Sequence, residues 1–205
     1  MENNLLQLIE KWKKETKTDD QVFEYERMLR FLYEKEILKK LPKKYYDIDL
    51  INVPEKIKDF VTRKDKNKKL FIHGAVGTGK TYLAYGIKAL MEVSANKLNI
   101  DDFVFINIPE LLLEPASLDI KKYYQTRNKR KVIVLDDLSV EKQSEWNIHR
   151  LYVLINGIYE NDHFLIITSN SNPQQLSERV GDRITSRILE NSTIIKTEGK
   201  DKRIL

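Results

Sequence analysis

Short apolar runs alternate along most of the chain with longer stretches whose apolar residues lie three or four positions apart. The short runs are typical of strands buried on both faces of a sheet, and the longer stretches of helices that bury one face. Four runs predict strands, at 70–73, 103–107, 132–135 and 164–168, and residues 192–196 predict a fifth. Strands that alternate with helices indicate right-handed βαβ connections, so we predict an α/β fold with a parallel sheet between two helical layers.

Capping residues and prolines mark the helices between these strands. The stretch Asn52–Glu55 predicts a helix start with Asn52 as the cap and Pro54 in the first turn. Pro109 opens another helix, Pro115 interrupts it, and a second piece is expected over about 118–126. Further helices are expected after the glycine-rich stretch that follows strand 70–73, over 146–158, and around Arg183 and Arg187.

Residues 1–42 predict two helices that precede this pattern. The first carries an apolar stripe between Leu5 and Trp12, and the second begins at the capping box Thr18–Gln21 and stops at Pro42. Helical periodicity indicates a buried face on each but not what covers it. We therefore expect an N-terminal helical arm, 1–42, that either packs on the following domain or binds a partner, and an α/β domain, 43–205.

The strongest chemical signal is the stretch Gly74–Thr81, which fits G-x-x-x-x-G-K-[ST] between a strand and a helix. Its glycines let the backbone wrap phosphate oxygens, and the helix N-terminus supplies partial positive charge. Lys80 can reach the β- and γ-phosphates, and the Thr81 hydroxyl can bind Mg²⁺. The nucleotide-binding residues expected here are Gly74, Gly77, Thr78, Gly79, Lys80, Thr81 and Tyr82.

Polar side chains follow two other predicted strands. Asp136 and Asp137 come directly after strand 132–135, and Asn170 follows strand 164–168. Ligands of such sheets bind at the carboxyl ends of the strands. We therefore place Asp136 near Mg²⁺, Asp137 as the base that orients water, and Asn170 beside that water or the γ-phosphate. An aspartate pair after a strand is also typical of a turn or helix cap, but the phosphate loop upstream favours the nucleotide role.

Hydrolysis of ATP spreads negative charge over the γ-phosphoryl oxygens, and an arginine commonly stabilises that charge. Arg183 and Arg187 lie four residues apart, hence on one helix face. An arginine there either serves the site of a neighbouring subunit or is a surface residue.

Composition removes several classes of site. The 205 residues include no cysteine, which excludes disulfides and thiolate metal sites, and the three histidines lack metal-ligand spacing. No apolar run approaches the ~20 residues that span a bilayer, and no signal-peptide pattern begins the chain. We therefore expect a cytoplasmic protein with no membrane partner.

A net charge of +5 permits an anionic partner. Basic and aromatic residues mix in Lys121–Tyr124 and Arg127–Lys131, a combination that can bind single-stranded DNA. The alternative is a helix whose tyrosines pack inward and whose lysines are solvated.

Together these motifs resemble the AAA+ ATPases, and more closely the DnaC/DnaI bacterial helicase loaders and the related IstB transposition helpers. The segments that carry the resemblance are Leu41–Tyr45, Gly74–Thr81, Val132–Leu138, Thr168–Asn170 and Arg183–Arg187. The resemblance covers about 41–205 and implies an AAA+ P-loop NTPase fold. It also implies ATP-dependent self-assembly, binding of single-stranded DNA and loading of the replicative hexameric helicase.

The resemblance assigns roles residue by residue. Lys80 and Thr81 are similar to Walker A, Asp136 and Asp137 to Walker B, and Asn170 to sensor 1. Arg187 is similar to the arginine finger that acts in trans, and Arg203 to the sensor 2 arginine, which contacts nucleotide.

The chain departs from the family in its arm: residues 1–42 are short for a helicase-binding domain and have no zinc-binding cysteines. Asp-Asp-Leu at 136–138, in place of Asp-Glu, and the paired arginines are the features that point to this branch. We expect hydrolysis of ATP to ADP and phosphate to be slow for the chain alone, because Asp137 is one methylene shorter than glutamate and the arginine finger must come from a neighbour. The alternatives are a transposase partner, a small P-loop metabolite kinase, and a nucleotide switch with little hydrolysis.

Overall fold

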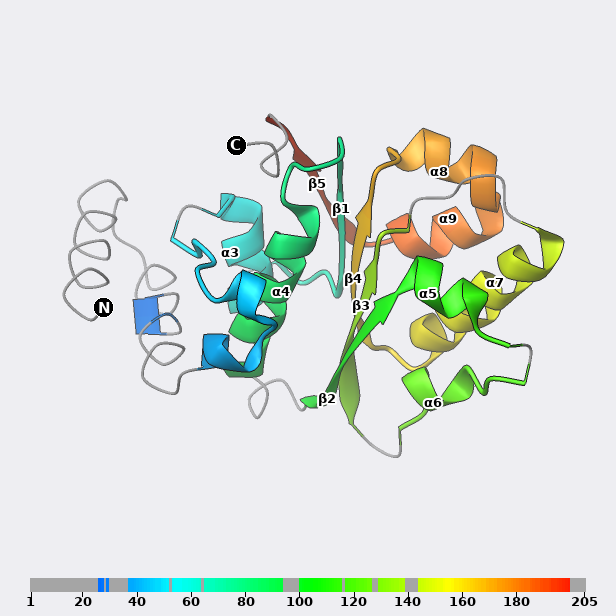
Figure 1. Ribbon diagram of the computed structural model, residues 1–205, viewed down its shortest axis with the longest axis horizontal. Helices are drawn as coiled ribbons and strands as arrows, with labels where there is room; N and C mark the ends of the chain where they lie inside the picture. Colours follow the sequence, from blue (N-terminus) through cyan, green and yellow to red (C-terminus); the bar gives the residue numbers. More distant parts are fainter. Residues whose placement is uncertain are drawn as a thin grey trace.

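The computed structural model describes residues 26–27, 29, 37–51, 53–63, 65–93, 100–115, 117–126, 129–138 and 144–199. A five-stranded parallel sheet with the order β2-β3-β4-β1-β5 forms its centre (Figure 1). The strands are β1 (Lys69–Gly74), β2 (Ile100–Asn107), β3 (Arg130–Asp136), β4 (Phe164–Ser169) and β5 (Ser192–Thr197). All five predicted strands are confirmed.

The burial pattern of the strands follows their place in the sheet. The central strand β4 is buried at every position, because helices cover both of its faces. At the edge, β5 alternates, with Thr193 and Ile195 buried and Ile194 and Lys196 exposed. The continuous apolar runs of the sequence therefore mark the interior strands, and the weaker 192–196 signal marks an edge strand.

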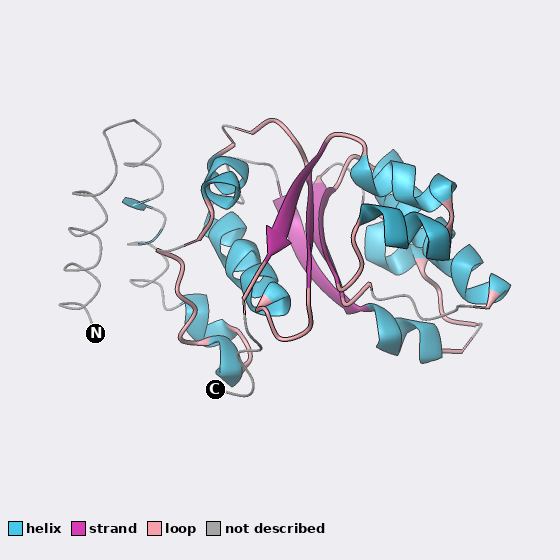
Figure 2. Ribbon diagram, turned by 90° about the horizontal axis from the view of Figure 1, so that it is seen from above, coloured by secondary structure: helices cyan, strands magenta, loops and turns pink. Residues whose placement is uncertain are grey.

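Helices cover both faces of the sheet, which gives the predicted three-layer α/β/α architecture (Figure 2). One layer holds the 3₁₀ turns η1 (Ile37–Lys40) and η2 (Lys43–Tyr45) with α3 (Glu55–Thr62) and α4 (Lys80–Val93). The other holds α5 (Ile108–Leu113), α6 (Lys121–Tyr124), α7 (Glu145–Glu160), α8 (Pro173–Val180) and α9 (Asp182–Leu189). Each layer has its own cluster of buried apolar side chains, so alternate residues of β1 serve different layers: Leu70 and Ile72 face α4, and Phe71 faces the α7 side.

Three helix predictions differ from the structure. Helix α3 begins at Glu55 rather than after an Asn52 cap, because Pro54 has an extended ψ of 142°; Asn52 itself lies outside the described residues. Helix α6 has four residues, shorter than the predicted 118–126. The helix of Arg183 and Arg187 is preceded by a separate helix, α8, which the Asn172 capping box starts and Gly181 ends with a φ of 86°.

Most of the predicted N-terminal arm lies outside the described residues. Within the described part, Leu29, Ile37 and Leu41 are buried in the same cluster as α3 and α4. The apolar stripe of the second predicted helix is thus used, at these three positions, to pack on the sheet domain.

A connector, residues 46–51, joins η2 to α3 and lies along α4. Gly86 of α4 makes room for it, since a Cβ there would come within 2.5 Å of the Leu50 side chain. Tyr82 fixes the connector further, because its hydroxyl accepts a hydrogen bond of 2.9 Å from Asp49 N–H and donates one to Asp47 O.

The topology brings the carboxyl ends of β1, β3 and β4 to the same end of the sheet. The loop after β1 leads to α4 on one face, whereas the chain after β3 and β4 continues to α7 and α8 on the other face. Such a switch between neighbouring strands opens a crevice at their carboxyl ends, where α/β sheets bind ligands. No helix in the described part of the chain is both long and apolar enough to cross a membrane.

Candidate nucleotide-binding site

The loop between β1 and α4 has the backbone that phosphate binding requires. Gly77 and Gly79 have φ angles of 79° and 91°, in the left-handed region that turns successive N–H groups toward a common side. Gly74 lies so close to β5 that a Cβ would come within 2.2 Å of Thr197 O. Glycine is therefore needed at 77 and 79 for the backbone angle, and at 74 because the neighbouring strand leaves no room for a Cβ.

Two threonine hydroxyls join this loop to the end of β5. Thr78 Oγ1 lies 2.7 Å from Thr197 Oγ1 and 2.8 Å from Ala75 O, and Thr197 Oγ1 donates to His73 O at 3.2 Å. Thr78, predicted as a nucleotide-binding residue, thus places its hydroxyl within the loop. Thr197 was not predicted as part of the site.

Lys80 lies inside the loop rather than in solvent. Its side chain is buried, and Nζ donates hydrogen bonds to Gly74 O at 2.9 Å and Ala75 O at 2.7 Å. The ammonium group and the N-terminus of α4 both bring positive charge to the concave side of the loop. The donor set and the glycine backbone therefore fit a triphosphate.

Asp136 connects the loop to the ends of β3 and β4. Its carboxylate accepts hydrogen bonds from Thr81 Oγ1 at 2.9 Å and from Thr168 Oγ1 at 2.7 Å. Burial raises the pKa of Asp136, the neighbouring Asp137 raises it further, and the two hydroxyl donors lower it. The predicted proximity of Thr81 and Asp136 is present in the structure.

Asp137 has a left-handed backbone, with a φ of 56°. Its N–H donates to Thr168 Oγ1 at 2.9 Å, and its Oδ1 accepts from Asn170 Nδ2 at 3.3 Å. Asp137 and Asn170 therefore form one polar pair beside the loop, which is the geometry needed to orient a water molecule.

The oxygen atoms of Thr81 and Asp136 fit Mg²⁺, which favours hard oxygen ligands. Within the described ranges, no group of three or more His, Cys, Asp and Glu side chains could hold a metal ion. A magnesium ion here would accordingly take its remaining ligands from phosphate oxygens and water, as is usual for this ion at a phosphate loop.

Thr168 and Lys44 belong to the site, and neither was assigned a role from the sequence. Thr168 bonds to both acidic residues. Lys44 is close enough to Asp136 to lower the pKa of that carboxyl, opposing burial. The sequence signal for Thr168 was its place at the end of an apolar run directly before Ser169-Asn170; nothing local to Lys44 marked it.

Two residues predicted to bind nucleotide, Tyr82 and Arg203, are not placed at the phosphate loop by the contacts of the described residues. The hydroxyl of Tyr82 holds the connector, so this group is engaged within the protein. Arg203 lies outside the described residues, and its predicted role stays a prediction.

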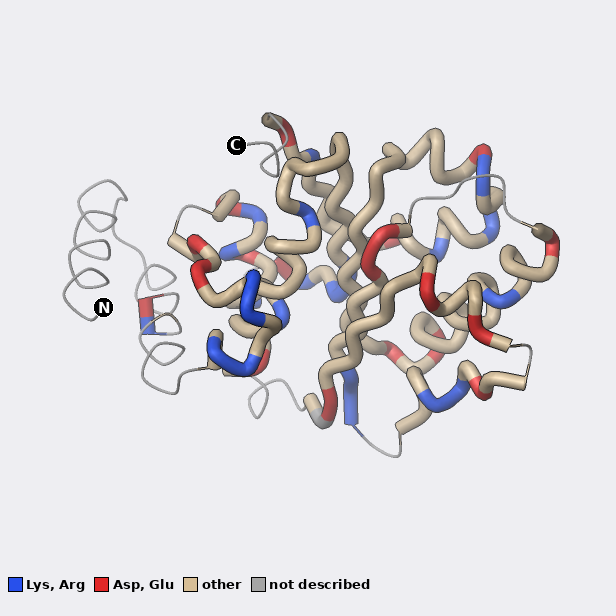
Figure 3. The backbone as a smooth tube through the Cα atoms, viewed as in Figure 1, with Lys and Arg blue, Asp and Glu red and all other residues tan. Residues whose placement is uncertain are grey.

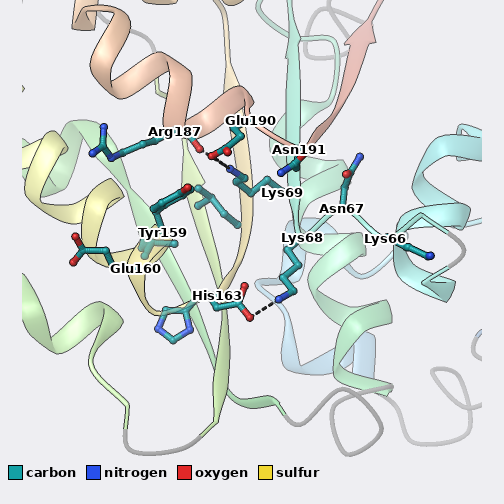
Figure 4. A pocket seen from close by; sticks show the side chains of 13 residues that line it. Lys66, Asn67, Lys68, Lys69, Tyr159, Glu160, His163, Arg187, Glu190 and Asn191 are labelled. Atoms are coloured by element: carbon teal, nitrogen blue, oxygen red, sulfur yellow. Dashed lines mark hydrogen bonds and ion pairs between the residues drawn. The ribbon is translucent and has the colours of Figure 1, made fainter.

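Arg187 does not join this site. Lys69 Nζ, at the start of β1, donates to Arg187 O at 2.7 Å, whereas the phosphate loop begins at the other end of that strand. The six-residue strand separates the two ends by roughly 16 Å. Arg187 instead lines a pocket of about 600 Å³ at the opposite edge of the sheet, together with Lys68, Lys69 and Glu190 (Figure 4).

The described part of the predicted DNA-binding stretch is partly exposed and partly engaged within the protein. Lys121 and Lys122 of α6 are exposed, but the Tyr124 ring lies against Gly157 of α7. Farther along, Lys131 is buried beside Asp102, and Arg130 pairs with Asp162. Figure 3 shows basic segments in α6 and in the 3₁₀ turns before α3, on opposite sides of the sheet.

Comparison with known proteins agrees with this site. Residues 51–194 match the family model of the bacterial DnaA ATPase domain. The chromosomal replication initiator protein DnaA of Campylobacter jejuni (strain 81-176) is 29% identical over 132 residues, which are 62% of this chain and 29% of DnaA. The chain thus spans less than a third of the length of that relative.

Two solved structures have the same fold. The crystal structure of DnaI is similar with a TM-score of 0.58 and 25% identity, over 82% of this chain and 93% of the solved DnaI chain. The crystal structure of the DnaC helicase loader is similar with a TM-score of 0.60 and 24% identity, over 77% of this chain and 100% of the solved DnaC chain. The matched region includes the phosphate loop, both aspartates, Asn170 and Arg187, and the chain therefore belongs to the bacterial DnaA ATPase domain family, a family of AAA+ ATP-binding proteins of DNA replication.

Proposed function

We propose that this chain is an ATP-dependent replication protein that binds the replicative hexameric helicase and loads it onto single-stranded DNA. Two observations favour a loader. The motifs resemble those of the DnaC/DnaI loaders, and the solved structures of DnaI and of the DnaC helicase loader have the same fold as this chain. Binding and hydrolysis of ATP switch the loader between states.

Hydrolysis begins with binding of the triphosphate by the loop and Lys80. Asp137 orients the attacking water and accepts its proton, and Asn170 holds the Asp137 carboxylate in position. Thr81 and Asp136 would hold Mg²⁺, which when bound would supply positive charge to the phosphate oxygens. These roles use the side chains that the ends of β1, β3 and β4 bring together.

The separation of Arg187 from the loop is the observation that carries the proposal of self-assembly. Because Arg187 lies at the opposite edge of the sheet, it cannot reach the γ-phosphate bound to its own chain. A neighbouring copy that docks its phosphate loop against the Arg187 end of the sheet would bring this arginine to the γ-phosphate of the nucleotide bound in that loop. Hydrolysis by an isolated chain is then slow, since the arginine is missing and Asp137 is one methylene shorter than glutamate.

Binding of single-stranded DNA is proposed through exposed basic residues, with Lys121 and Lys122 of α6 as the candidates. Tyr124 is excluded as a base-stacking residue by its contact with Gly157. The expected contribution is therefore electrostatic, and it should weaken as salt rises.

The test is light scattering after size exclusion of the protein mixed with the replicative helicase of its host. The mixture is run with ATP and Mg²⁺, without nucleotide, and with the Lys80→Ala variant. A complex heavier than the helicase hexamer that requires ATP and Lys80 supports the proposal. Absence of a complex in every condition overturns it.

A second candidate is an initiator-type protein that assembles on DNA without a helicase, and the DnaA family match favours it. In the same experiment, single-stranded DNA replaces the helicase. An ATP-dependent assembly on DNA, with no helicase complex, selects this candidate. A transposase partner, tested in the same way, is the third outcome.

A further inference from the structure

The guanidinium of Arg187 is held in one orientation by helix α7. Its Nε donates a hydrogen bond of 2.8 Å to Asn156 Oδ1, and one terminal nitrogen donates to Arg183 O at 3.1 Å. The rings of Tyr152 and Tyr159 lie 5.3 and 5.9 Å from its central carbon. Arg187 is thus positioned by its neighbours before any second chain arrives.

Asn156 is itself oriented from its other side. Its Nδ2 donates a hydrogen bond of 2.8 Å to Glu160 Oε1, one turn further along α7. A carboxylate only accepts and a guanidinium only donates, so the amide oxygen must face Arg187 and the amide nitrogen Glu160. The chain Glu160–Asn156–Arg187 therefore has a single arrangement that satisfies all three side chains.

The amide keeps the nearby carboxylate away from the guanidinium. Across the described residues, Arg187 forms no ion pair with a carboxylate. An aspartate at position 156 would hold Arg187 equally well but would neutralise it, and a neutralised arginine stabilises a phosphoryl transition state far less. An amide orients the group and leaves its charge available.

We propose that Asn156 is a positioning residue for catalysis in the neighbouring subunit: it fixes Arg187 for contact with the γ-phosphate while leaving its positive charge unneutralised. This inference rests on the proposed role of Arg187 in trans. It distinguishes Arg187 from Arg183, whose exposed guanidinium, among the described residues, contacts only the Tyr152 ring, at 4.7 Å.

The test compares ATP turnover of four variants at a concentration where the protein self-assembles. Arg187→Ala should lower turnover by at least about tenfold, since such an arginine is worth 10³-fold or more elsewhere. Asn156→Ala should lower it about three- to tenfold through misplacement. Asn156→Asp should lower it as far as Arg187→Ala, and its thermal stability should fall somewhat, because the new carboxylate loses the hydrogen bond to Glu160 and repels it. Arg183→Ala, the matched control, keeps the backbone oxygen that Arg187 contacts and should retain turnover within about twofold.

A mixing experiment separates positioning from a general structural role. Asp137→Asn protein retains an intact Arg187 but has an inactive site, so in excess it should restore turnover to Asn156→Ala sites by supplying the arginine. If Arg187→Ala is impaired but both Asn156 variants match wild type, the inference is wrong. Failure of Asp137→Asn protein to restore turnover to Asn156→Ala also overturns it, since the defect is then local. If Arg187→Ala itself keeps full turnover, the proposed role of Arg187 fails instead.

Discussion

The Thr168 hydroxyl donates a hydrogen bond of 2.7 Å to Asp136 Oδ1. Thr168 Oγ1 also accepts a hydrogen bond of 2.9 Å from the N–H of the next acidic residue, Asp137. One side chain at the end of β4 therefore sets the orientation of both aspartates at the end of β3, across the boundary between two strands.

Replacing Thr168 by valine keeps the volume of the side chain and removes this hydroxyl. The Asp137 N–H then loses its acceptor and Asp136 loses one donor, so we expect ATP turnover to fall about tenfold and the free energy of unfolding to fall by ~1–3 kcal/mol. Nucleotide affinity, measured by titration of a fluorescent analogue, should change by less than about threefold, because Lys80 and the loop are untouched. Thr168→Ser, which retains the hydroxyl, is the control; full turnover in Thr168→Val would contradict the role.

Gly74→Ala tests the close approach of β1 to β5. The new Cβ would meet a backbone oxygen, Thr197 O, at 2.2 Å, so one of the two strands must move. We expect a loss of at least about 3 kcal/mol in chemical unfolding, or failure to fold. Gly181→Ala is the matched control: its φ of 86° also disfavours a side chain, but nothing lies within 4 Å. That variant should lose ~1–3 kcal/mol from its backbone conformation, and an equal loss in the two would show that the collision is not decisive.

The contact between Gly157 and Tyr124 predicts that Gly157→Ala destabilises the native protein but stabilises a variant that lacks the Tyr124 ring. In the native background, Gly157→Ala places a Cβ about 2.4 Å from the Tyr124 ring and should destabilise the protein by ~1–3 kcal/mol. In a Tyr124→Ala background the same change should stabilise it by up to about 1 kcal/mol, since alanine is the better helix former. A double-mutant cycle of urea midpoints measures this coupling, and additive effects would argue against the contact.

Buried His163 predicts a stability that declines in mild acid. Its Nδ1 accepts from Lys131 N–H at 3.2 Å, and its Nε2 lies 2.6 Å from Tyr124 O, an arrangement that suits the neutral ring with hydrogen on Nε2. Burial lowers the pKa of His163 below its usual value near 6.5. The unfolded chain therefore binds the proton first, so this stabilisation is complete above about pH 6.5 and decreases as the pH falls toward the lowered pKa.

Urea unfolding at several pH values between 7.5 and 5.5 measures that decline. His163→Gln should reduce the dependence of the unfolding free energy on pH, whatever the stability of this variant at pH 7.5. His149 is exposed, so the control His149→Gln should leave that pH dependence unchanged. Because burial also lowers the pKa of His73, part of the slope should persist in His163→Gln. An unchanged slope in His163→Gln would contradict the prediction.

Local patterns predicted the parts of the site that lie within one strand and its following loop. Lys80, Thr81, Asp136 and Asn170 follow from motif spacing and from the rule that parallel strands end at one edge. The links between strands could not be predicted, because the bond from Thr168 to Asp136 depends on the register of β3 against β4. The hydrophobic pattern predicts which strands are buried, but it does not predict which strand lies beside which in the sheet.

The same limit applies to the helices. The Asn172 capping box and Gly181 mark the two ends of α8 in the sequence, although no helix was predicted between them. By contrast, the support of Arg187 by Asn156 joins residues 31 positions apart, and no local signal marks it. The place of Tyr124 against Gly157 likewise required the packing of α6 on α7.

The placement of Arg187 and the phosphate loop on opposite edges of the sheet has a consequence for stoichiometry. Under the proposed role of Arg187 in trans, each copy would give its arginine to one neighbour and receive one from another, so contacts of this kind would be head-to-tail. An open row of such copies always has one fewer complete catalytic centre than it has subunits, and only closure into a ring equalises the two numbers. The ratio of hydrolysed to retained ATP per assembly would thus reveal whether the row is open or closed.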